Sequence, residues 1–307
     1  LVIPERSGNP KVSFLYSLKI PFINFKHCAR LDVIIEKGVK GETMENEKIL
    51  RLRDLRMRFG SHQVLQGIDL DVYRGQIIGY IGPNGAGKST TLKIMLGLIE
   101  GYEGTVEIFG ENIAEGDVSY KRRIGYVPEN AEVYDNLTAA EYLTFVGELY
   151  GMSRNEAEEK ALALLTQFEM EDVFHQRISS FSKGMRQKVI LVSSMLHNPD
   201  LIFLDEPLSG LDANSVMIIK DIMEQLKEQG KTIVYSSHMM DIVERISNRI
   251  ILLVNGKIAA DGTFEELKEQ NKEGSLEGIF NQLTGFDVHK ETAEKFVQIV
   301  TGDEANE

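Results

Sequence analysis

The sequence predicts an α/β fold with a mostly parallel sheet at its core, and two observations support this prediction. In the second half of the chain, strand patterns at 201–204, 232–236 and 250–254 alternate with helical patterns at 213–229 and 239–246. Strands that alternate with helices in this way imply a parallel sheet covered on both faces. The second observation is an apolar run at 76–81, which leads through a glycine-rich segment into a helix at 89–98.

Two segments depart from this alternation and predict smaller subdomains. Short strand patterns with turn signals between them lie at 49–53, 67–72 and 104–109, which indicates an antiparallel β subdomain. Residues 137–176 instead place apolar residues at helical spacing, and a further helix is expected at 183–196. We therefore predict a helical subdomain at about 130–185.

The main domain is predicted to cover residues 44–262, with a helical tail at 263–307 that contains two or three short helices. Residues 1–43 show no sustained period, and we expect low order there. One interpretation of this extension is a segment that touches a membrane or regulates the protein. The other is that Met44 is the natural start and the preceding residues are not native.

Composition excludes several classes of protein. Lys and Arg number 34 against 47 Asp and Glu, a net charge of −13, which argues against a general nucleic-acid binder because phosphate contacts need clustered cations. The single cysteine, Cys28, cannot form an internal disulfide, and no Cys/His cluster has zinc spacing. No apolar run approaches the roughly 18 residues that would span a bilayer.

The strongest motif lies in the glycine-rich segment. It reads Gly82-Pro83-Asn84-Gly85-Ala86-Gly87-Lys88-Ser89-Thr90 and matches the phosphate-binding loop of P-loop NTPases, between a strand and a helix as that motif requires. Glycines let successive backbone N–H groups converge on phosphate oxygens. Lys88 adds a charge near the terminal phosphates, and the Ser89 hydroxyl is placed to hold Mg²⁺. The alternative is a glycine-rich turn without a ligand.

Two adjacent acids, Asp205 and Glu206, follow the apolar strand at 201–204. Placing carboxylates at the end of a buried strand is costly unless they have a function. Asp205 suits a Mg²⁺ ligand because hard cations prefer oxygen, and Glu206 suits a general base for the attacking water. The alternative is a buried strand that simply ends in a polar turn.

Three further segments make the chain resemble the ATP-binding-cassette (ABC) family. Phe181-Ser182-Lys183-Gly184-Met185-Arg186-Gln187-Lys188 resembles the family's signature, commonly L-S-G-G-Q; Ser209-Gly210-Leu211-Asp212 resembles its D-loop, and His238 its switch histidine. The motifs lie in the family's order within residues 49–260. The resemblance implies ATP and Mg²⁺ as ligands and a head-to-tail dimer, homo- or heteromeric, with two ATP molecules between the subunits.

The signature residues Ser182 and Gly184 are expected at the start of a helix. The Ser182 hydroxyl and the free amides of that helix start would form an anion site. By resemblance, they would bind the ATP held by a second subunit. Ser182 also fits a simple helix cap.

By resemblance, His238 would contact the γ-phosphate and hold Glu206 and water, which makes Glu206 and His238 the expected catalytic residues. Phe59 resembles the family's adenine-stacking aromatic residue. The alternatives are a structural histidine and a core phenylalanine. His27, His62, His175, His197 and His289 match no motif.

Two positions depart from the family pattern. Glu129, in the segment Gly125-Tyr126-Val127-Pro128-Glu129, stands where the family usually has Gln, and would bring a further negative charge to the Mg²⁺ site formed by Ser89 and Asp205. Lys183 and Met185 replace the common Gly and Gln, whereas Ser182 and Gly184 are kept.

These resemblances predict the ATP-hydrolysing subunit of a transporter, peripheral at the cytoplasmic face of the membrane and partnered by a separate permease. The tail segments 262–267 and 275–280 resemble exporter-type cassettes, so we favour export. An ABC ATPase that acts outside transport is a second hypothesis, although such proteins usually carry two cassettes or a long coiled-coil insert. A nucleotide sensor that barely hydrolyses is a third, and the presence of Glu206 and His238 argues against it.

Overall fold

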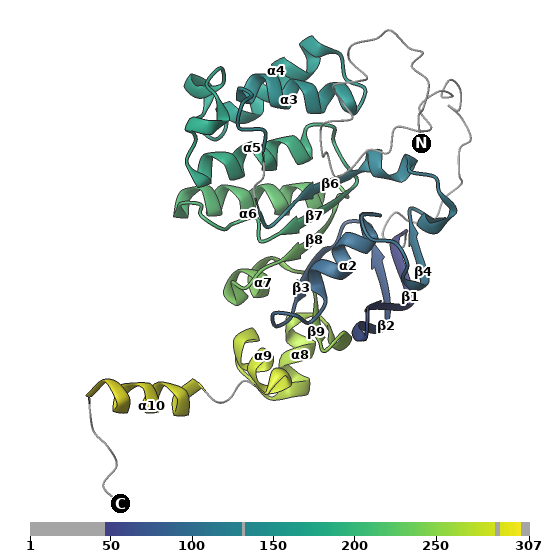
Figure 1. Ribbon diagram of the computed structural model, residues 1–307, viewed down its shortest axis with the longest axis vertical. Helices are drawn as coiled ribbons and strands as arrows, with labels where there is room; N and C mark the ends of the chain where they lie inside the picture. Colours follow the sequence, from purple (N-terminus) through teal and green to yellow (C-terminus); the bar gives the residue numbers. More distant parts are fainter. Residues whose placement is uncertain (1–46, 131–132, 286–288, 302–307) are drawn as a thin grey trace, which may run out of the picture. The chain divides into compact units, whose positions relative to one another are not determined.

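The computed structural model describes residues 47–130, 133–285 and 289–301, whose strands form two sheets (Figure 1). The strands are β1 (Lys48–Phe59), β2 (His62–Tyr73), β3 (Ile77–Ile81), β4 (Glu103–Ile108), β5 (Glu111–Asn112), β6 (Ile124–Val127), β7 (Leu201–Asp205), β8 (Thr232–Ser236), β9 (Arg249–Val254) and β10 (Lys257–Gly262). The α-helices are α2 (Lys88–Met95), α3 (Ala139–Leu149), α4 (Arg154–Thr166), α5 (Lys183–Met195), α6 (Ala213–Glu228), α7 (Met240–Ile246), α8 (Phe264–Asn271), α9 (Leu276–Thr284) and α10 (His289–Thr301).

The larger sheet has six strands in the order β10-β9-β3-β8-β7-β6. Four of its five strand pairings are parallel, and the fifth, between β10 and β9 at the edge, is antiparallel. Every residue of β3, β7 and β8 is buried, as expected for parallel strands covered on both faces. Because β3 and β7 both flank β8 and run the same way, the loops that follow them meet at one edge of the sheet.

The smaller sheet is antiparallel, with the order β2-β1-β4-β5. Strands β1 and β2 form a long hairpin in which Phe59 pairs with His62 across the turn. Apolar side chains of β1 and β2, such as Leu55 and Leu65, are fully buried beneath it. This sheet contributes the turn at the far end of the site described below.

The helices pack against one another and against the larger sheet. Helix α3 packs against α4, and both pack against α5, which in turn contacts β6 at the edge of the larger sheet (Figure 1). Helix α6 contacts β8 and α7 contacts β3, while α8 and α9 contact each other and the β9–β10 edge. Within the described ranges, no helix is both long and apolar enough to cross a membrane.

The predicted fold class is confirmed. The structure has a mostly parallel sheet, an antiparallel sheet and a group of helices, α3 to α5, that lies between β6 and β7 in the sequence. Three strands were not expected, and one of them, β5, has only two residues. Strand β6 has only four residues between a basic run and Pro128, and β10 alternates between exposed and half-buried residues. The extension at 1–43 lies outside the described residues, and the domain boundaries stay predictions.

Candidate active site

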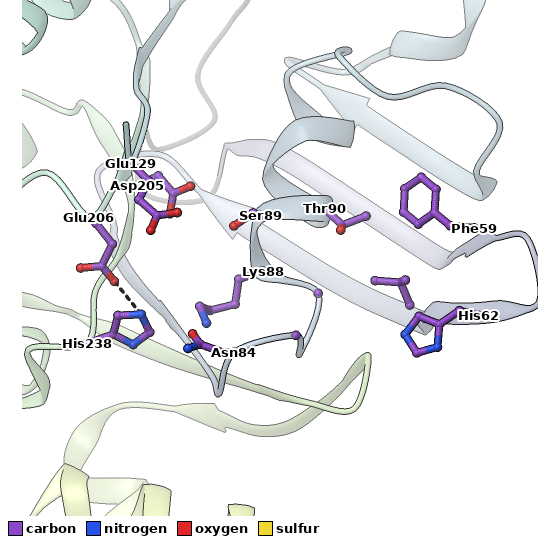
Figure 2. A pocket seen from close by; sticks show the side chains of 13 residues that line it. Phe59, His62, Asn84, Lys88, Ser89, Thr90, Glu129, Asp205, Glu206 and His238 are labelled. Atoms are coloured by element: carbon purple, nitrogen blue, oxygen red, sulfur yellow. Dashed lines mark ion pairs between the residues drawn. The ribbon is translucent and has the colours of Figure 1, made fainter. Parts of the chain in front are cut away.

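A cavity of about 380 Å³ opens at the carboxyl edge of the parallel sheet (Figure 2). Its lining comes from the β1–β2 hairpin, the glycine-rich loop with α2, the segment after β6, and the ends of β7 and β8: Phe59, His62, Val64, Asn84, Gly85, Gly87, Lys88, Ser89, Thr90, Glu129, Asp205, Glu206 and His238. Segments far apart in the sequence thus converge on one site.

The glycine-rich loop reverses the chain between β3 and α2. Gly85 and Gly87 have φ angles of +78° and +104°, a backbone region in which side chains are strained. A Cβ at Gly87 would also lie 2.5 Å from Leu65 Cδ2, so this turn requires glycine on steric grounds as well. The loop places Lys88 as the first residue of α2. The first residues of α2 line the cavity, and the backbone N–H groups of a helix start have no partner within the helix.

Lys88 is the cation at the centre of the cavity. Its Nζ donates hydrogen bonds to the backbone carbonyls of Gly82 and Pro83, the latter at 3.1 Å. Burial lowers the pKa of Lys88, and the carboxylates of Glu206 and Asp205 oppose that shift. The loop therefore holds a partly desolvated ammonium group where phosphate oxygens would compete with its carbonyls.

Asp205 ends β7 and is only 5% exposed. It pairs with Ser236 in the parallel register, and the Ser236 hydroxyl donates a hydrogen bond to its Oδ1. Burial raises the pKa of Asp205, while the Ser236 hydrogen bond acts in the opposite direction. One carboxylate oxygen is thus fixed against the sheet.

Glu206 follows in a left-handed backbone conformation, with φ of +48°. Strained conformations of non-glycine residues are frequent at functional sites. Its Oε1 lies 3.4 Å from His238 Nε2, the pair marked in Figure 2. Burial raises the pKa of Glu206, and the neighbouring His238 lowers it. The side chain is 17% exposed, so it is protected from bulk water but open to the cavity.

Phe59 and His62 lie on the opposite side of Lys88 from these acids (Figure 2). Phe59 is 48% exposed, which rules out the core position that the sequence left open. His62 and Val64 were not predicted as site residues. No sequence motif marks His62; it pairs with Phe59 across a two-residue turn, which puts both side chains at the same end of the hairpin.

The signature residues do not line this cavity. Ser182 caps α5 by accepting a hydrogen bond from Met185 N at 3.2 Å, and Lys183 Nζ donates to Ser209 Oγ at 3.0 Å. Buried Gln187 donates to the carbonyl of Pro207 at 3.0 Å, which ties α5 to the turn after Glu206. Glycine loop residues Gly82, Pro83 and Ala86 also lie outside the lining, although two of them hold Lys88.

Comparison with known proteins identifies this arrangement. Residues 65–209 match the family model described as ABC transporter. An ABC transporter ATP-binding protein of Methanocaldococcus jannaschii is 38% identical over 218 residues, which cover 71% of this chain and 79% of that protein. The ABC-type transporter ATP-binding protein EcsA of Bacillus subtilis is 34% identical over 245 residues, covering 79% and 99% of the two chains. The chain belongs to the ABC transporter ATP-binding family.

Solved structures agree with this assignment. The cassette matches the ATP-binding subunit of an ABC transporter with a TM-score of 0.72 and 34% identity over 76% of this chain and 99% of that one. It also matches a dimeric ATP-binding cassette in a post-hydrolysis state with ADP and phosphate, with a TM-score of 0.64 and 26% identity over 70% and 98% of the chains. The protein is therefore an ABC ATPase that binds and hydrolyses ATP, as its phosphate-binding loop predicted.

Proposed function

We propose that this ABC ATPase hydrolyses ATP in the cavity at the sheet edge and thereby powers a separate membrane permease, in the direction of export. One observation carries the catalytic part of the proposal. The acids that end β7 face Lys88 and Ser89 in the same cavity, although more than a hundred residues separate them in sequence. The residues proposed to bind the triphosphate, the metal ion and the attacking water therefore line the same cavity.

The oxygen ligands of this cavity fit Mg²⁺. The Ser89 hydroxyl and the carboxylates of Asp205 and Glu129 all line it. Across the described residues, no cluster of three or more His, Cys, Asp or Glu side chains forms a metal cage. Such an incomplete set suits Mg²⁺, which usually takes one or two carboxylates together with substrate phosphates. When bound, the ion would neutralise charge on the phosphate oxygens.

We assign the protonic chemistry to Glu206 and His238. Glu206 accepts a proton from the water that attacks the γ-phosphate, and His238 holds that carboxylate and the departing phosphate in place. The raised pKa of Glu206 brings it nearer to the operating pH, which favours a general base. Phe59 stacks on the adenine, for which its exposed ring at the cavity end is suitably placed.

Ser182 and Gly184 act, in this proposal, on the ATP of a second subunit. Both lie outside the cavity of their own chain, yet Ser182 is exposed at the start of α5. Free amides at a helix start attract anions. The dimeric cassette with ADP and phosphate is a structural relative that supports such pairing.

The membrane partner is argued from the relatives. Several of them are named ATP-binding proteins of ABC transporters, and a Bacillus subtilis relative, 33% identical over 219 residues, is the linearmycin resistance ATP-binding protein LnrL. Export of a toxic compound is one route to resistance, which supports export here. The partner permease would place this subunit at the cytoplasmic face of the membrane. An ABC ATPase without a permease is the alternative.

The catalytic assignment is tested with Glu206→Gln. The neutral amide cannot take a proton from water, so we expect a fall in kcat of at least about 100-fold with ATP affinity within a few-fold of wild type. Steady-state hydrolysis and equilibrium binding of a fluorescent ATP analogue measure the two quantities. Unchanged hydrolysis would refute the role of Glu206.

The transport assignment needs a separate experiment. Affinity purification of the chain from detergent-solubilised membranes is expected to recover a polytopic membrane protein, and vesicles containing both are expected to move cargo away from the ATPase side. Recovery of ribosomes or other assemblies in place of a membrane protein would favour the alternative.

A further inference from the structure

Two consecutive serines at the end of β8 face the two consecutive acids at the end of β7. The parallel register pairs Asp205 with Ser236, and the backbone N–H of Glu206 donates to the carbonyl of Ser236 at 3.1 Å. The Ser236 hydroxyl bonds Asp205, and the next hydroxyl, that of Ser237, lies 3.4 Å from Glu206 Oε2. Each acid therefore has a hydroxyl partner of its own on the neighbouring strand end.

The Ser237 hydroxyl is oriented by its surroundings. Its oxygen accepts a hydrogen bond from the backbone N–H of Met239 at 3.1 Å, and its proton donates to Glu206. The Tyr235 hydroxyl is a further neighbour, and its interaction with Ser237 opposes the rise that burial causes in the pKa of Tyr235. Ser237 is only 2% exposed, so water does not compete for this contact. Hydrogen bonds of catalytic groups are often long before substrate binds and shorten in the reactive complex.

The two partners of the Glu206 carboxylate differ in how firmly they are held. The His238 side chain, on Oε1, is 56% exposed and is free to turn toward a phosphate. Ser237, on Oε2, directly follows β8, is only 2% exposed and is also bonded by the backbone N–H of Met239, so it is held more firmly than His238.

We propose that Ser237 is a positioning residue for hydrolysis: its hydroxyl holds Glu206 Oε2 and so fixes the orientation of the Glu206 carboxylate in the cavity. This inference rests on the assignment of Glu206 as the general base. The simpler role is local, because the bond from Met239 N to Ser237 Oγ by itself stabilises the turn into α7. A positioning role predicts that loss of the hydroxyl lowers kcat, and only while Glu206 is present. A purely local role predicts no such dependence on Glu206.

The test compares Ser237→Val with Ser237→Thr, two side chains of similar shape of which only Thr keeps the hydroxyl. We expect S237V to lower kcat about tenfold while KM for ATP stays within about twofold, because a hydrogen bond to a charged group is lost in the reacting state. S237T is expected to retain kcat within about threefold. Ser194→Ala is the matched control, since this buried hydroxyl bonds only the carbonyl of Leu191 in its own helix.

A second arm asks whether the effect passes through Glu206. In a Glu206→Gln background, adding S237V is expected to change residual single-turnover hydrolysis by less than about twofold, because the group that Ser237 positions is already disabled. Equal kcat for S237V and S237T, or a full tenfold loss in the E206Q background, would overturn the inference. Undiminished hydrolysis in E206Q alone would instead refute the proposed role of Glu206, so the two failures are distinct.

Discussion

Glu129 lies in the cavity at a position where the family usually has Gln. It lines the same cavity as Asp205, and its charge is one of the influences that raise the pKa of Asp205. Burial is the larger cause of that shift. A second carboxylate near the proposed metal ligands makes the cavity more negative, and a bound divalent cation would relieve that repulsion.

This electrostatic argument predicts the effect of Glu129→Gln. Two unit charges a few ångströms apart interact by about 1 kcal/mol even in a water-like environment, which corresponds to about fivefold in affinity. We therefore expect the Mg²⁺ concentration for half-maximal ATPase activity to rise about fivefold in E129Q, measured at saturating ATP. Glu148→Gln removes one exposed charge from α3 and serves as control. No change in E129Q would remove Glu129 from the metal site.

Phe59 supports a second prediction at this scale. Its ring is half exposed at the end of the cavity, so removing it costs little folding energy but leaves the adenine without a stacking surface. Aromatic pairs contribute about 0.5–1.5 kcal/mol beyond the area they bury. Phe59→Ala is expected to raise KM for ATP about five- to tenfold with kcat unchanged, and Phe59→Tyr to stay within about twofold. A loss of kcat in F59A would indicate a role other than binding.

Among the elements, α6 depends on its cap. Asp212 begins this helix, and its carboxylate accepts hydrogen bonds from Ser215 N at 2.9 Å and Ser215 Oγ at 2.6 Å. These bonds lower the pKa of Asp212 to about 2. The D-loop residue therefore has a structural role within its own subunit, in addition to any role across a dimer.

The cap makes a prediction with a defined pH dependence. A carboxyl group whose pKa is lower in the folded protein stabilises it above the unfolded pKa, about 3.9, and loses that effect as pH falls toward 2. Asp212→Ala is therefore expected to melt below wild type at pH 7, with the difference shrinking below pH 4. Asp212→Asn, which also caps helices, should melt close to wild type at pH 7. A difference between wild type and D212A that persists at pH 2 would contradict this account.

Elements with strong local patterns were predictable from sequence. Strand β8 was expected at 232–236 and is found there, because an apolar run bounded by polar residues has few alternatives. Strand β6 was missed because four residues give too short a pattern. The left-handed backbone of Glu206 and its contact with Ser237 were also not predictable, since both depend on how β7 and β8 pair across the sheet.

Within the site, Lys88, Glu129, Glu206 and His238 converge on one cavity because each follows a strand of the same parallel sheet, whereas Phe59 reaches it from the antiparallel sheet. His62 was missed because hairpin pairing, and no motif, places it beside Phe59. The proposed contact of Ser182 and Gly184 with ATP follows neither from the sequence nor from a single chain, because both residues lie outside the cavity of their own subunit.

At the scale of the whole molecule, the proposed pairing of two copies means that one chain would hold two incomplete halves of a site. The cavity supplies Lys88 and the acids, while the exposed start of α5 supplies Ser182. Head-to-tail pairing of two subunits would join each half to its complement, and a closed pair of this kind has two equivalent sites. Hydrolysis would then depend on the dimer, so its specific rate should rise with protein concentration.

Mixing two inactive variants provides the decisive test of this arrangement. Ser182→Asp keeps the cap of α5 but repels a γ-phosphate, and Lys88→Ala disables the phosphate-binding loop. Each variant alone is expected to be inactive. In an equal mixture, about half of randomly paired dimers are mixed and each has one intact site, so about a quarter of wild-type ATPase activity should return. Activity in S182D alone would show that each site is complete within one subunit, and no recovery in the mixture would show that both sites must be intact together.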